Sequence, residues 1–296
     1  FDLISSKTTG HAKIKSFLFV NEVTELIIGS RWIKRIPEML KNPIRSIIKI
    51  ITFLATPFIF WSLISKKECD ILLLNNGGYP GGLSNYIISL IAKLKNVSKR
   101  FMIVRNFPDC GRKSFTVVNM ISNYSLTKII TVSDSLRWEM LHKTTIRKEL
   151  LIRIHNGISI NNKLEEDKNN IISRKYKDNL FAAIIGTLED RKGHEILFRA
   201  WVFIKEIFPE SKLLVIGSSK SGDKIRLEKV AHNLNISESI VWIEYVSNIG
   251  KYYNYVDVVV MPSQNFESFG RVCAEAMAFK KPIVASNVGG IPEIIE

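Results

Sequence analysis

Short apolar runs alternate with helical stretches along most of this chain, and that rhythm restricts the fold more than any other feature. Runs such as Cys69–Asn75, Phe181–Ile185 and Lys212–Ile216 have the length and composition of buried parallel strands. Helical patterns follow them, for example over residues 83–95 and 193–208. Strand–helix alternation predicts an α/β fold with parallel sheets that carry helices on both faces.

The same patterns predict the remaining elements. We expect further strands at 100–104, 128–132, 151–154, 240–242, 256–261 and 282–286, and further helices at 133–142, 224–233, 249–255 and 270–279. Ser133 and Asp134 offer an N-cap for the helix that begins there.

Residues 161–178 are polar and charged, which is typical of a connection between domains. A chain of 296 residues has room for two domains. We therefore expect two Rossmann-like domains, residues 1–160 and 161–296, with parallel sheets facing a central cleft. Open parallel sheets bind ligands at the carboxyl ends of their strands, so the cleft is the expected site.

The chain begins at Phe1 and ends at Glu296, inside what reads as the start of a helix. We expect a fragment truncated at both ends. On that expectation, the first strand of the N-terminal domain and the C-terminal end of the second domain are missing.

The positive charge is unevenly placed. Residues 1–156 contain 24 of the 42 Lys and Arg but only 10 of the 28 Asp and Glu, which accounts for the whole net charge of +14. A field of this kind attracts anionic lipid, a phosphorylated acceptor or nucleic acid. The alternative is a solvated basic surface without a partner.

One segment, Ile50–Ile64, is predominantly apolar and contains no charged residue. It is shorter than the roughly 20 residues that a spanning helix needs, Pro57 lies in its middle, and lysines flank it. The expectation is burial, or contact with a membrane surface beneath the basic flanks, rather than a span.

Cysteine and histidine spacing predicts no metal site. Cys69, Cys110 and Cys273 form no C-x-x-C pair, and the five histidines have no ligand spacing. Reduced thiols are the simplest interpretation, with Cys273 as a small buried residue.

The most informative stretch is PSQNFESFGRVCAEAMA, residues 262–278. An apolar strand ends at Met261, a polar loop carries Glu267, and a helix follows Gly270. The first-turn amides of that helix are suited to a diphosphate. Glu275 lies in the same helix, and a carboxylate accepts two hydrogen bonds side by side, as a vicinal diol requires. We expect the two glutamates at different depths of one pocket.

The loop Asn75–Gly82 (NNGGYPGG) also joins a strand to a helix. Its amides, with Gly77 and Gly78, could hold an anionic group. The alternative is a tight turn without a ligand.

The spacing Glu267-x7-Glu275 resembles the donor-site signature of the retaining glycosyltransferases of family 4, which have the GT-B fold. Residues 184–193 (IIGTLEDRKG) resemble that family's first C-domain strand and lysine loop, and residues 282–293 (PIVASNVGGIPE) also fit in order and spacing. Residues 69–109 resemble the N-domain of bacterial polysaccharide glycosyltransferases. The resemblance covers nearly the whole chain and is weakest over residues 1–65.

The resemblance implies a role for each matching position. Glu275 would bind the ribose hydroxyls, Glu267 would contact the transferred sugar, and Lys192 would clamp the diphosphate. The further donor-site positions are Phe269, Gly270, Arg271, Val272, Gly186, Thr187, Arg191, Gly289 and Gly290, with Gly77 and Gly78 in the N-terminal half.

Two positions depart from the family pattern. Thr187 stands where the family usually has an arginine, and Arg191 is the candidate to replace that cation. Arg105 stands where many members have a histidine. An arginine stays protonated and cannot act as a base, but it can stabilise a departing diphosphate.

The implied function is metal-independent transfer of a hexosyl unit, or a derivative, from a nucleoside-diphosphate sugar of the UDP or GDP type, with retention and without a cofactor. The acceptor would be a glycan or a polyprenyl-diphosphate-linked sugar in bacterial polysaccharide, lipopolysaccharide or capsule synthesis. The enzyme would be cytoplasmic, with peripheral contact at the inner face of the membrane. The alternatives are a sugar-nucleotide epimerase of the same fold, an inactive relative, and a basic nucleic-acid-binding protein, although no nucleic-acid-binding signature occurs.

Overall fold

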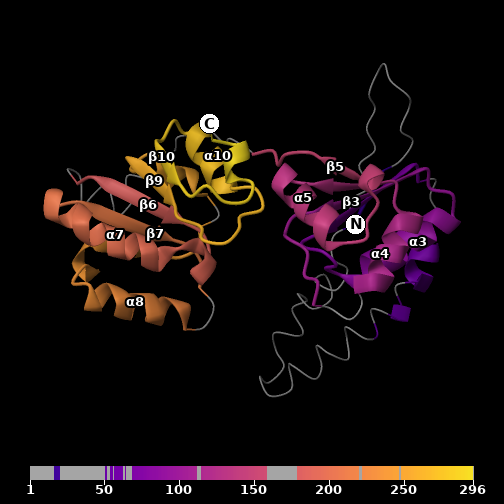
Figure 1. Cartoon of the computed structure of the whole chain (residues 1–296), viewed down its shortest axis with the longest axis horizontal. Coiled ribbons are helices and arrows are strands. Elements are labelled where there is room, and N and C mark those ends of the chain that lie inside the picture. The colour runs from indigo at the N-terminus through magenta and orange to yellow at the C-terminus, as the bar shows by residue number, and fades with distance from the viewer. Residues whose placement is uncertain are drawn as a thin grey trace. The chain divides into compact units, whose positions relative to one another are not determined.

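The structure is a computed structural model, and it describes residues 17–20, 51, 54–55, 57–62, 64, 69–111, 115–158, 179–219, 222–246 and 248–295. The chain forms two compact units, Phe1–His155 and Asn156–Glu296 (Figure 1). The predicted connection at 161–178, residues 1–16 and Glu296 lie outside the described residues.

The N-terminal unit is built on a parallel sheet. In its described part the strands lie in the order β1-β2-β3-β4-β5. The strands are β1 (Phe17–Val20), β2 (Ile71–Asn76), β3 (Lys99–Val104), β4 (Lys128–Thr131) and β5 (Leu151–Arg153). The helices are α3 (Leu83–Leu94), α4 (Phe115–Ser125), α5 (Asp134–Lys143) and the short 3-10 helix η2 (Lys148–Leu150).

Local sequence explains the start of α5. The Ser133 side chain accepts a hydrogen bond from the Leu136 amide at 3.0 Å, which satisfies one of the unpaired first-turn amides. The predicted N-cap is confirmed.

Helix α4 was not predicted, because its buried face is mostly polar. Buried Asn119 accepts a hydrogen bond from the Tyr79 hydroxyl at 2.6 Å, and Ser125 shares one of 2.7 Å with Ser89. The spacing of apolar residues in α4 therefore does not indicate which face of the helix is buried.

The C-terminal unit repeats the architecture. Its described strands are parallel and lie in the order β10-β9-β6-β7-β8. The strands are β6 (Phe181–Ile185), β7 (Lys212–Ile216), β8 (Ile240–Ile243), β9 (Val258–Met261) and β10 (Ile283–Ala285). The helices are η3 (Asp190–Lys192), α7 (His194–Ile207), α8 (Asp223–Asn233), η4 (Ser237–Ser239), α9 (Gly250–Tyr253), α10 (Arg271–Ala278) and η5 (Ile291–Glu293).

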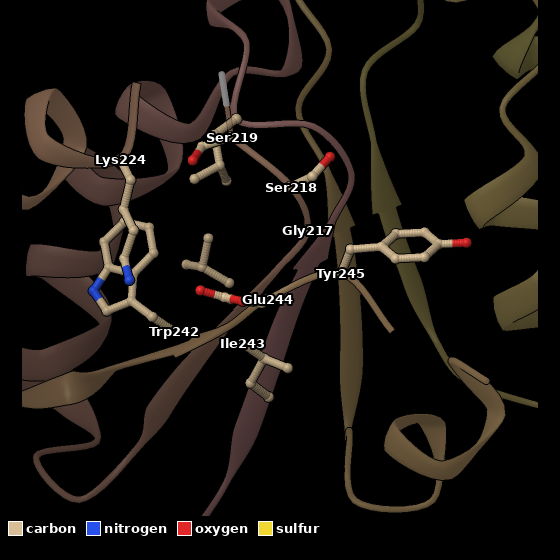
Figure 2. A pocket seen from close by; sticks show the side chains of 10 residues that line it. Gly217, Ser218, Ser219, Lys224, Trp242, Ile243, Glu244 and Tyr245 are labelled. Atoms are coloured by element: carbon tan, nitrogen blue, oxygen red, sulfur yellow. The ribbon is translucent and has the colours of Figure 1, made fainter. Parts of the chain in front are cut away.

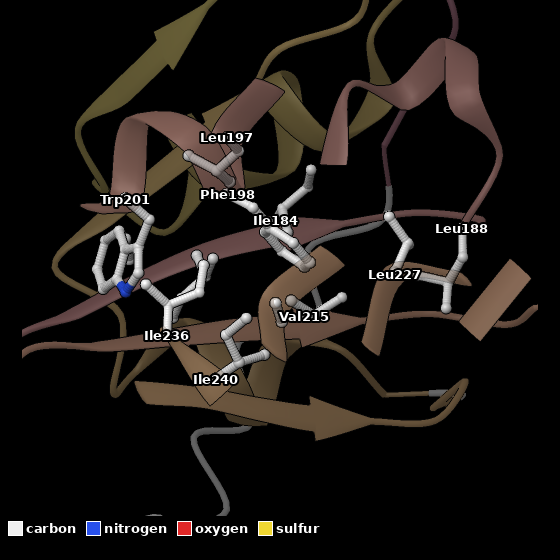
Figure 3. Packing of buried hydrophobic residues seen from close by; sticks show 12 residues of the cluster. Ile184, Leu188, Leu197, Phe198, Trp201, Val215, Leu227, Ile236 and Ile240 are labelled. Carbon is white, nitrogen blue, oxygen red and sulfur yellow. The ribbon is translucent and has the colours of Figure 1, made fainter. Parts of the chain in front are cut away.

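Two hydrophobic layers hold this second sheet, because successive side chains of a strand point to opposite faces. On one face, Ile184 and Val215 pack beneath α7 and α8, as Figure 3 shows. On the other face, Ala183 and Leu214 pack with α9 and α10, where Tyr253 is fully buried. The prediction of an α/β fold with parallel sheets is confirmed. The predicted cleft concerns the relative placement of the units and stays a prediction.

The apolar segment at 50–64 is both buried and exposed. All of its described residues are helical. Phe60 and Ile64 are buried, whereas Phe58 is 79% exposed. Within the described residues, no helix has the length and hydropathy needed to cross a bilayer.

Candidate active site

The candidate site of the C-terminal unit lies where neighbouring parallel strands end. The loops after β6, β7 and β9 leave the sheet at its carboxyl edge, and these loops carry most of the predicted site residues. Gly193 allows two of them to touch. Its φ is +76°, and a Cβ there would lie 1.9 Å from the Pro262 carbonyl oxygen, so a side chain has no room.

A cavity of about 390 Å³ opens at this edge. It brings together five predicted positions, Gly186, Thr187, Arg271, Val272 and Glu275. Residues that sequence reasoning did not single out complete its wall, and they include Ser218, Tyr245 and Val246. Their only sequence signal is that each follows the end of an expected strand.

Glu275 lies in α10 and projects into this cavity wall with an ion-pair partner. The Arg271 guanidinium donates to Glu275 Oε1 at 2.9 Å, one helical turn away. Gly270, with φ of +93°, precedes the helix. The Cys273 amide already donates to the Gly270 carbonyl oxygen at 2.9 Å. The amides of Arg271 and Val272 are therefore the first-turn donors that a ligand can use. Buried Phe269 precedes that glycine. The helix therefore offers amide donors and a carboxylate to the same cavity.

Thr187 presents an unsatisfied hydroxyl. Its Oγ1 is buried and has no hydrogen-bond partner in the part of the chain that the structure describes. Thr187 also lines the cavity. Because a buried hydroxyl without a partner is costly, a ligand or water in this cavity would relieve it.

Glu267 is held by cations rather than lining the cavity. Lys192 Nζ lies 2.5 Å from Glu267 Oε2, and the two side chains are only 13% and 14% exposed. The Arg191 guanidinium lies 3.5 Å from the same oxygen, and the Ser263 hydroxyl donates to it at 3.5 Å. Arg191 also pairs with Glu189 at 2.9 Å. The carboxylate is therefore partly neutralised by two cations.

The pair adjoins the cavity through Gly186. A Cβ on Gly186 would lie 3.6 Å from Lys192 Cε, and Gly186 lines the cavity. The structure thus separates the two glutamates: Glu275 is among the lining residues of this cavity, and Glu267 is not. We expected both carboxylates in one pocket. In the structure, Glu275 lines the cavity and Glu267 forms an ion pair beside it.

Gly289 and Gly290 shape the Glu267 loop. The Gly290 amide donates to the Glu267 carbonyl oxygen at 2.8 Å. Gly289 has φ of +58°, and a Cβ there would lie 2.1 Å from that same oxygen. These two predicted glycines therefore act on the backbone that positions Glu267.

A second cavity of about 270 Å³ adjoins the first and shares Gly217, Ser218 and Tyr245 with it. Figure 2 shows Lys224 and Trp242 on one side, with the Tyr245 ring pointing away from them. The Lys224 ammonium lies 5.9 Å from the Trp242 ring centroid. Tyr245 thus stands between two pockets of the same strand end.

His194 is a further residue that sequence reasoning missed. It begins α7 beside Lys192 and is 2% exposed. Neither ring nitrogen makes a hydrogen bond of normal geometry within the described residues, although a polar contact with the Glu189 main chain slightly opposes the pKa shift. Burial, reinforced by the charges of Lys192 and Arg226, lowers the pKa of His194 to about 4. The imidazole is therefore neutral at physiological pH.

The predicted residues of the N-terminal unit lie at its own carboxyl edge. Gly77 and Gly78 follow β2, and exposed Arg105 follows β3. Asn76 organises the glycine loop: its side-chain amide donates to Pro80 O at 2.8 Å, and its Oδ1 accepts from the Gly82 amide at 3.2 Å. The loop is therefore ordered by its own side chains.

Cys273 is fully buried, as predicted. Its Sγ lies 3.2 Å from the Met261 sulfur, and burial raises the pKa of its thiol to about 11. Over the described ranges, no group of three or more His, Cys, Asp or Glu side chains could hold a metal ion.

Residues 165–296 match the protein family described as "Glycosyl transferases group 1". An uncharacterized glycosyltransferase of Methanocaldococcus jannaschii is 34% identical over 192 residues, which are 62% of this chain and 48% of that protein. The capsular polysaccharide biosynthesis glycosyltransferase CapM of Staphylococcus aureus is 31% identical over 61% of this chain and 49% of its own length. The chain therefore spans about half the length of the curated relatives it matches.

Solved structures show the same fold at low identity. The crystal structure of Anabaena HepE in complex with UDP has a TM-score of 0.67 and 20% identity, over 81% of this chain and 65% of that one. A glycosyltransferase from Rickettsia africae has a TM-score of 0.65 and 21% identity, over 83% and 65%. Residues 165–296 are thus similar to the glycosyl transferases group 1 family, and the described part of the chain has the GT-B fold of its structural neighbours.

Proposed function

We propose that this protein is a retaining glycosyltransferase of family 4. It moves a hexosyl unit, or a derivative, from a nucleoside-diphosphate sugar to a glycan or a polyprenyl-diphosphate-linked acceptor. One observation carries the proposal: Glu275, the Thr187 hydroxyl and the first turn of α10 converge on one cavity, and the Lys192–Glu267 pair adjoins it.

Glu275 binds the ribose of the donor in this proposal. An ionised carboxylate has about four acceptor sites, so Glu275 can accept from two ribose hydroxyls while it keeps its bond to Arg271. Tyr245 and Val246 lie in the same wall and supply apolar surface for the base. The cavity volume of about 390 Å³ is within the usual range for a small-molecule site.

Lys192 stabilises the diphosphate leaving group. An ammonium has three donors, so Lys192 can keep Glu267 and still donate to a phosphoryl oxygen. The α10 amides, Arg191 and the Thr187 hydroxyl add donors, and charge compensation of this kind requires no metal ion. Thr187 replaces a cation by a neutral donor, which places more of the charge compensation on Lys192 and Arg191.

Glu267 contacts the transferred sugar and stabilises positive charge at the reacting carbon. Its backbone is positioned by Gly289 and Gly290, and its carboxylate by Lys192. A carboxylate fixed in this way is preorganised for the transition state. Retention of configuration follows from the resemblance to family 4.

The ligands of structural neighbours support a UDP-type donor and a glycan acceptor. Anabaena HepE was solved with UDP and with UDP-glucose. A TarM mutant was solved with UDP and α-GlcNAc-glycerol. CapM is described as a capsular polysaccharide biosynthesis enzyme.

The N-terminal unit is the acceptor side. Arg105, Gly77 and Gly78 provide a cation and backbone amides at its carboxyl edge. The net positive charge of the chain comes from residues 1–156, which suits an anionic acceptor at the inner face of the cell membrane. The enzyme would thus be cytoplasmic and peripheral.

Donor binding and product identity test the proposal. A UDP- or GDP-sugar at a hundred times its Kd should raise the free energy of unfolding by about 2.7 kcal/mol, measured as a thermal shift against ADP-sugars. Turnover should label an acceptor rather than isomerise the donor, and NMR of the product should show the donor's anomeric configuration. No shift with any nucleotide sugar would contradict the donor site.

A further inference from the structure

Helix α4 packs with its polar side inward. Three of its four buried residues are polar, namely Asn119, Ser122 and Ser125. Its exposed large apolar side chains are Val117, Met120 and Tyr124, spaced three and four residues apart on one helical face. A helix at a plain protein–water surface has the opposite arrangement. The exposed face of α4 is therefore built for an apolar or amphipathic environment.

The helical residues within 51–64 show a second stripe of the same kind. Ile51, Leu54, Phe58 and Trp61 are exposed and lie three or four residues apart. Phe60 and Ile64, on another face, supply the buried contacts. This segment is thus apolar both toward the core and toward solvent.

Lysines accompany the aromatic side chains of both stripes. The Lys95 ammonium lies 3.8 Å from the Trp61 ring centroid, and the Lys93 ammonium lies 3.4 Å from that of Tyr124. Both lysines come from the C-terminal end of α3, where Leu94 between them is exposed. In Figure 1, α3 and α4 lie next to each other, and they are in contact. The two stripes therefore meet at the end of α3.

We propose that these two stripes and the lysines between them form a docking surface for an anionic lipid bilayer. Aromatic side chains flanked by lysine are typical of the membrane–water interface, where the ring enters the headgroup layer and the ammonium meets phosphate. The net charge of +14 on the same part of the chain complements anionic lipid. This surface would make the membrane contact that the proposed function includes. The proposal rests on that membrane contact and does not depend on the donor site.

Co-sedimentation with vesicles tests the surface. The full chain should bind phosphatidylcholine–phosphatidylglycerol vesicles at low salt, and it should bind pure phosphatidylcholine vesicles much more weakly. The variant Phe58→Ser/Met120→Ser should lower the partition coefficient on the order of tenfold or more, because both side chains would enter the interface. Lys93→Gln and Lys95→Gln should each lower it about fivefold on anionic vesicles only.

Phe203→Ser is the matched control, because Phe203 is 66% exposed but lies in α7 of the other unit. It should bind vesicles as the wild type does. UDP binding should be equal in all variants, so a failure of the donor site is distinguished from a failure of this surface.

The proposal would be overturned if the Phe58→Ser/Met120→Ser variant had the same vesicle partition coefficient as the wild type. Equal binding of the wild type to neutral and anionic vesicles would overturn it as well. A third contrary outcome is a concentration-dependent dimer that this variant dissociates, with no vesicle binding, since the surface would then join two copies of the chain.

Discussion

The ion pair between Lys192 and Glu267 can be measured by a double-mutant cycle. At 2.5 Å, two unit charges attract by roughly 6–7 kcal/mol at an effective dielectric constant of about 20. Desolvation of two side chains that are 13% and 14% exposed offsets most of this attraction. We expect a net coupling free energy of about 2 kcal/mol.

The double variant should lose less stability than the sum of the losses of the two single variants. Lys192→Met leaves Glu267 with Arg191 and Ser263, each at 3.5 Å, so the carboxylate is not fully orphaned. We expect a loss of about 2 kcal/mol, below the 3–5 kcal/mol of a fully buried broken pair. In the Glu267→Gln background, the same change should cost little. Urea denaturation followed by circular dichroism measures how the free energy of unfolding changes in the two single variants and the double variant. The Tm should fall by about 4–8 °C in Lys192→Met.

A matched pair exists in the N-terminal unit. Lys143 Nζ also lies 2.5 Å from a carboxylate oxygen of Glu139, but the Lys143 side chain is 51% exposed. The corresponding cycle there should give only about 0.3–0.5 kcal/mol, because solvent screens the pair. If Lys192→Met and Glu267→Gln were additive within about 0.5 kcal/mol, the reasoning would be refuted.

Three further predictions follow from the same geometry. Glu275→Gln should weaken UDP binding about 10- to 100-fold in calorimetry while leaving the fold intact, because it removes a charged acceptor worth about 1.5–3 kcal/mol; unchanged affinity would remove Glu275 from the site. The pKa of His194 is lowered to about 4 in the folded protein, so the unfolded chain, with a pKa near 6.5, binds more protons between these values. The free energy of unfolding should therefore fall by about 3 kcal/mol as the pH drops from about 6.5 to about 4, and His194→Gln should abolish that part of the pH dependence in urea titrations; an identical profile in the variant would contradict the assignment. Exposed Cys110 should react with a thiol reagent in the native protein while buried Cys273, whose thiol pKa is raised to about 11, should not; equal labelling of both before unfolding would show that Cys273 is accessible.

Local sequence predicted the described strands of both sheets except β1, and the α-helices that follow them except α4. Strand β6 coincides with its predicted range, and helix α7 differs from its own by one residue at each end. Apolar runs and glycine positions are sufficient here, because a buried parallel strand and the helix that covers it each leave a pattern in a short stretch of chain. The Ser133 cap could be predicted for the same reason.

Helix α4 and strand β1 were not predicted, because their packing does not follow that pattern. Helix α4 buries small polar side chains and exposes Val117 and Met120, so its apolar residues mark the wrong face. Strand β1 is four residues long and pairs with β2, which lies some fifty residues further along the chain. Neither the hydrogen bond of Asn119 with Tyr79 nor the strand pairing is visible in a local window.

The sequence alone determined which chemical groups this protein has at its strand ends: two glutamates, a lysine, several glycines and a helix start. The tertiary structure decided their grouping. It set Glu275 and the Thr187 hydroxyl on one cavity, and it paired Glu267 with Lys192, which lies 75 positions away in the sequence. The physical reason is that parallel strands bring distant loops to one edge, whereas strand register and backbone contacts such as that of Gly289 with Glu267 set which side chains meet.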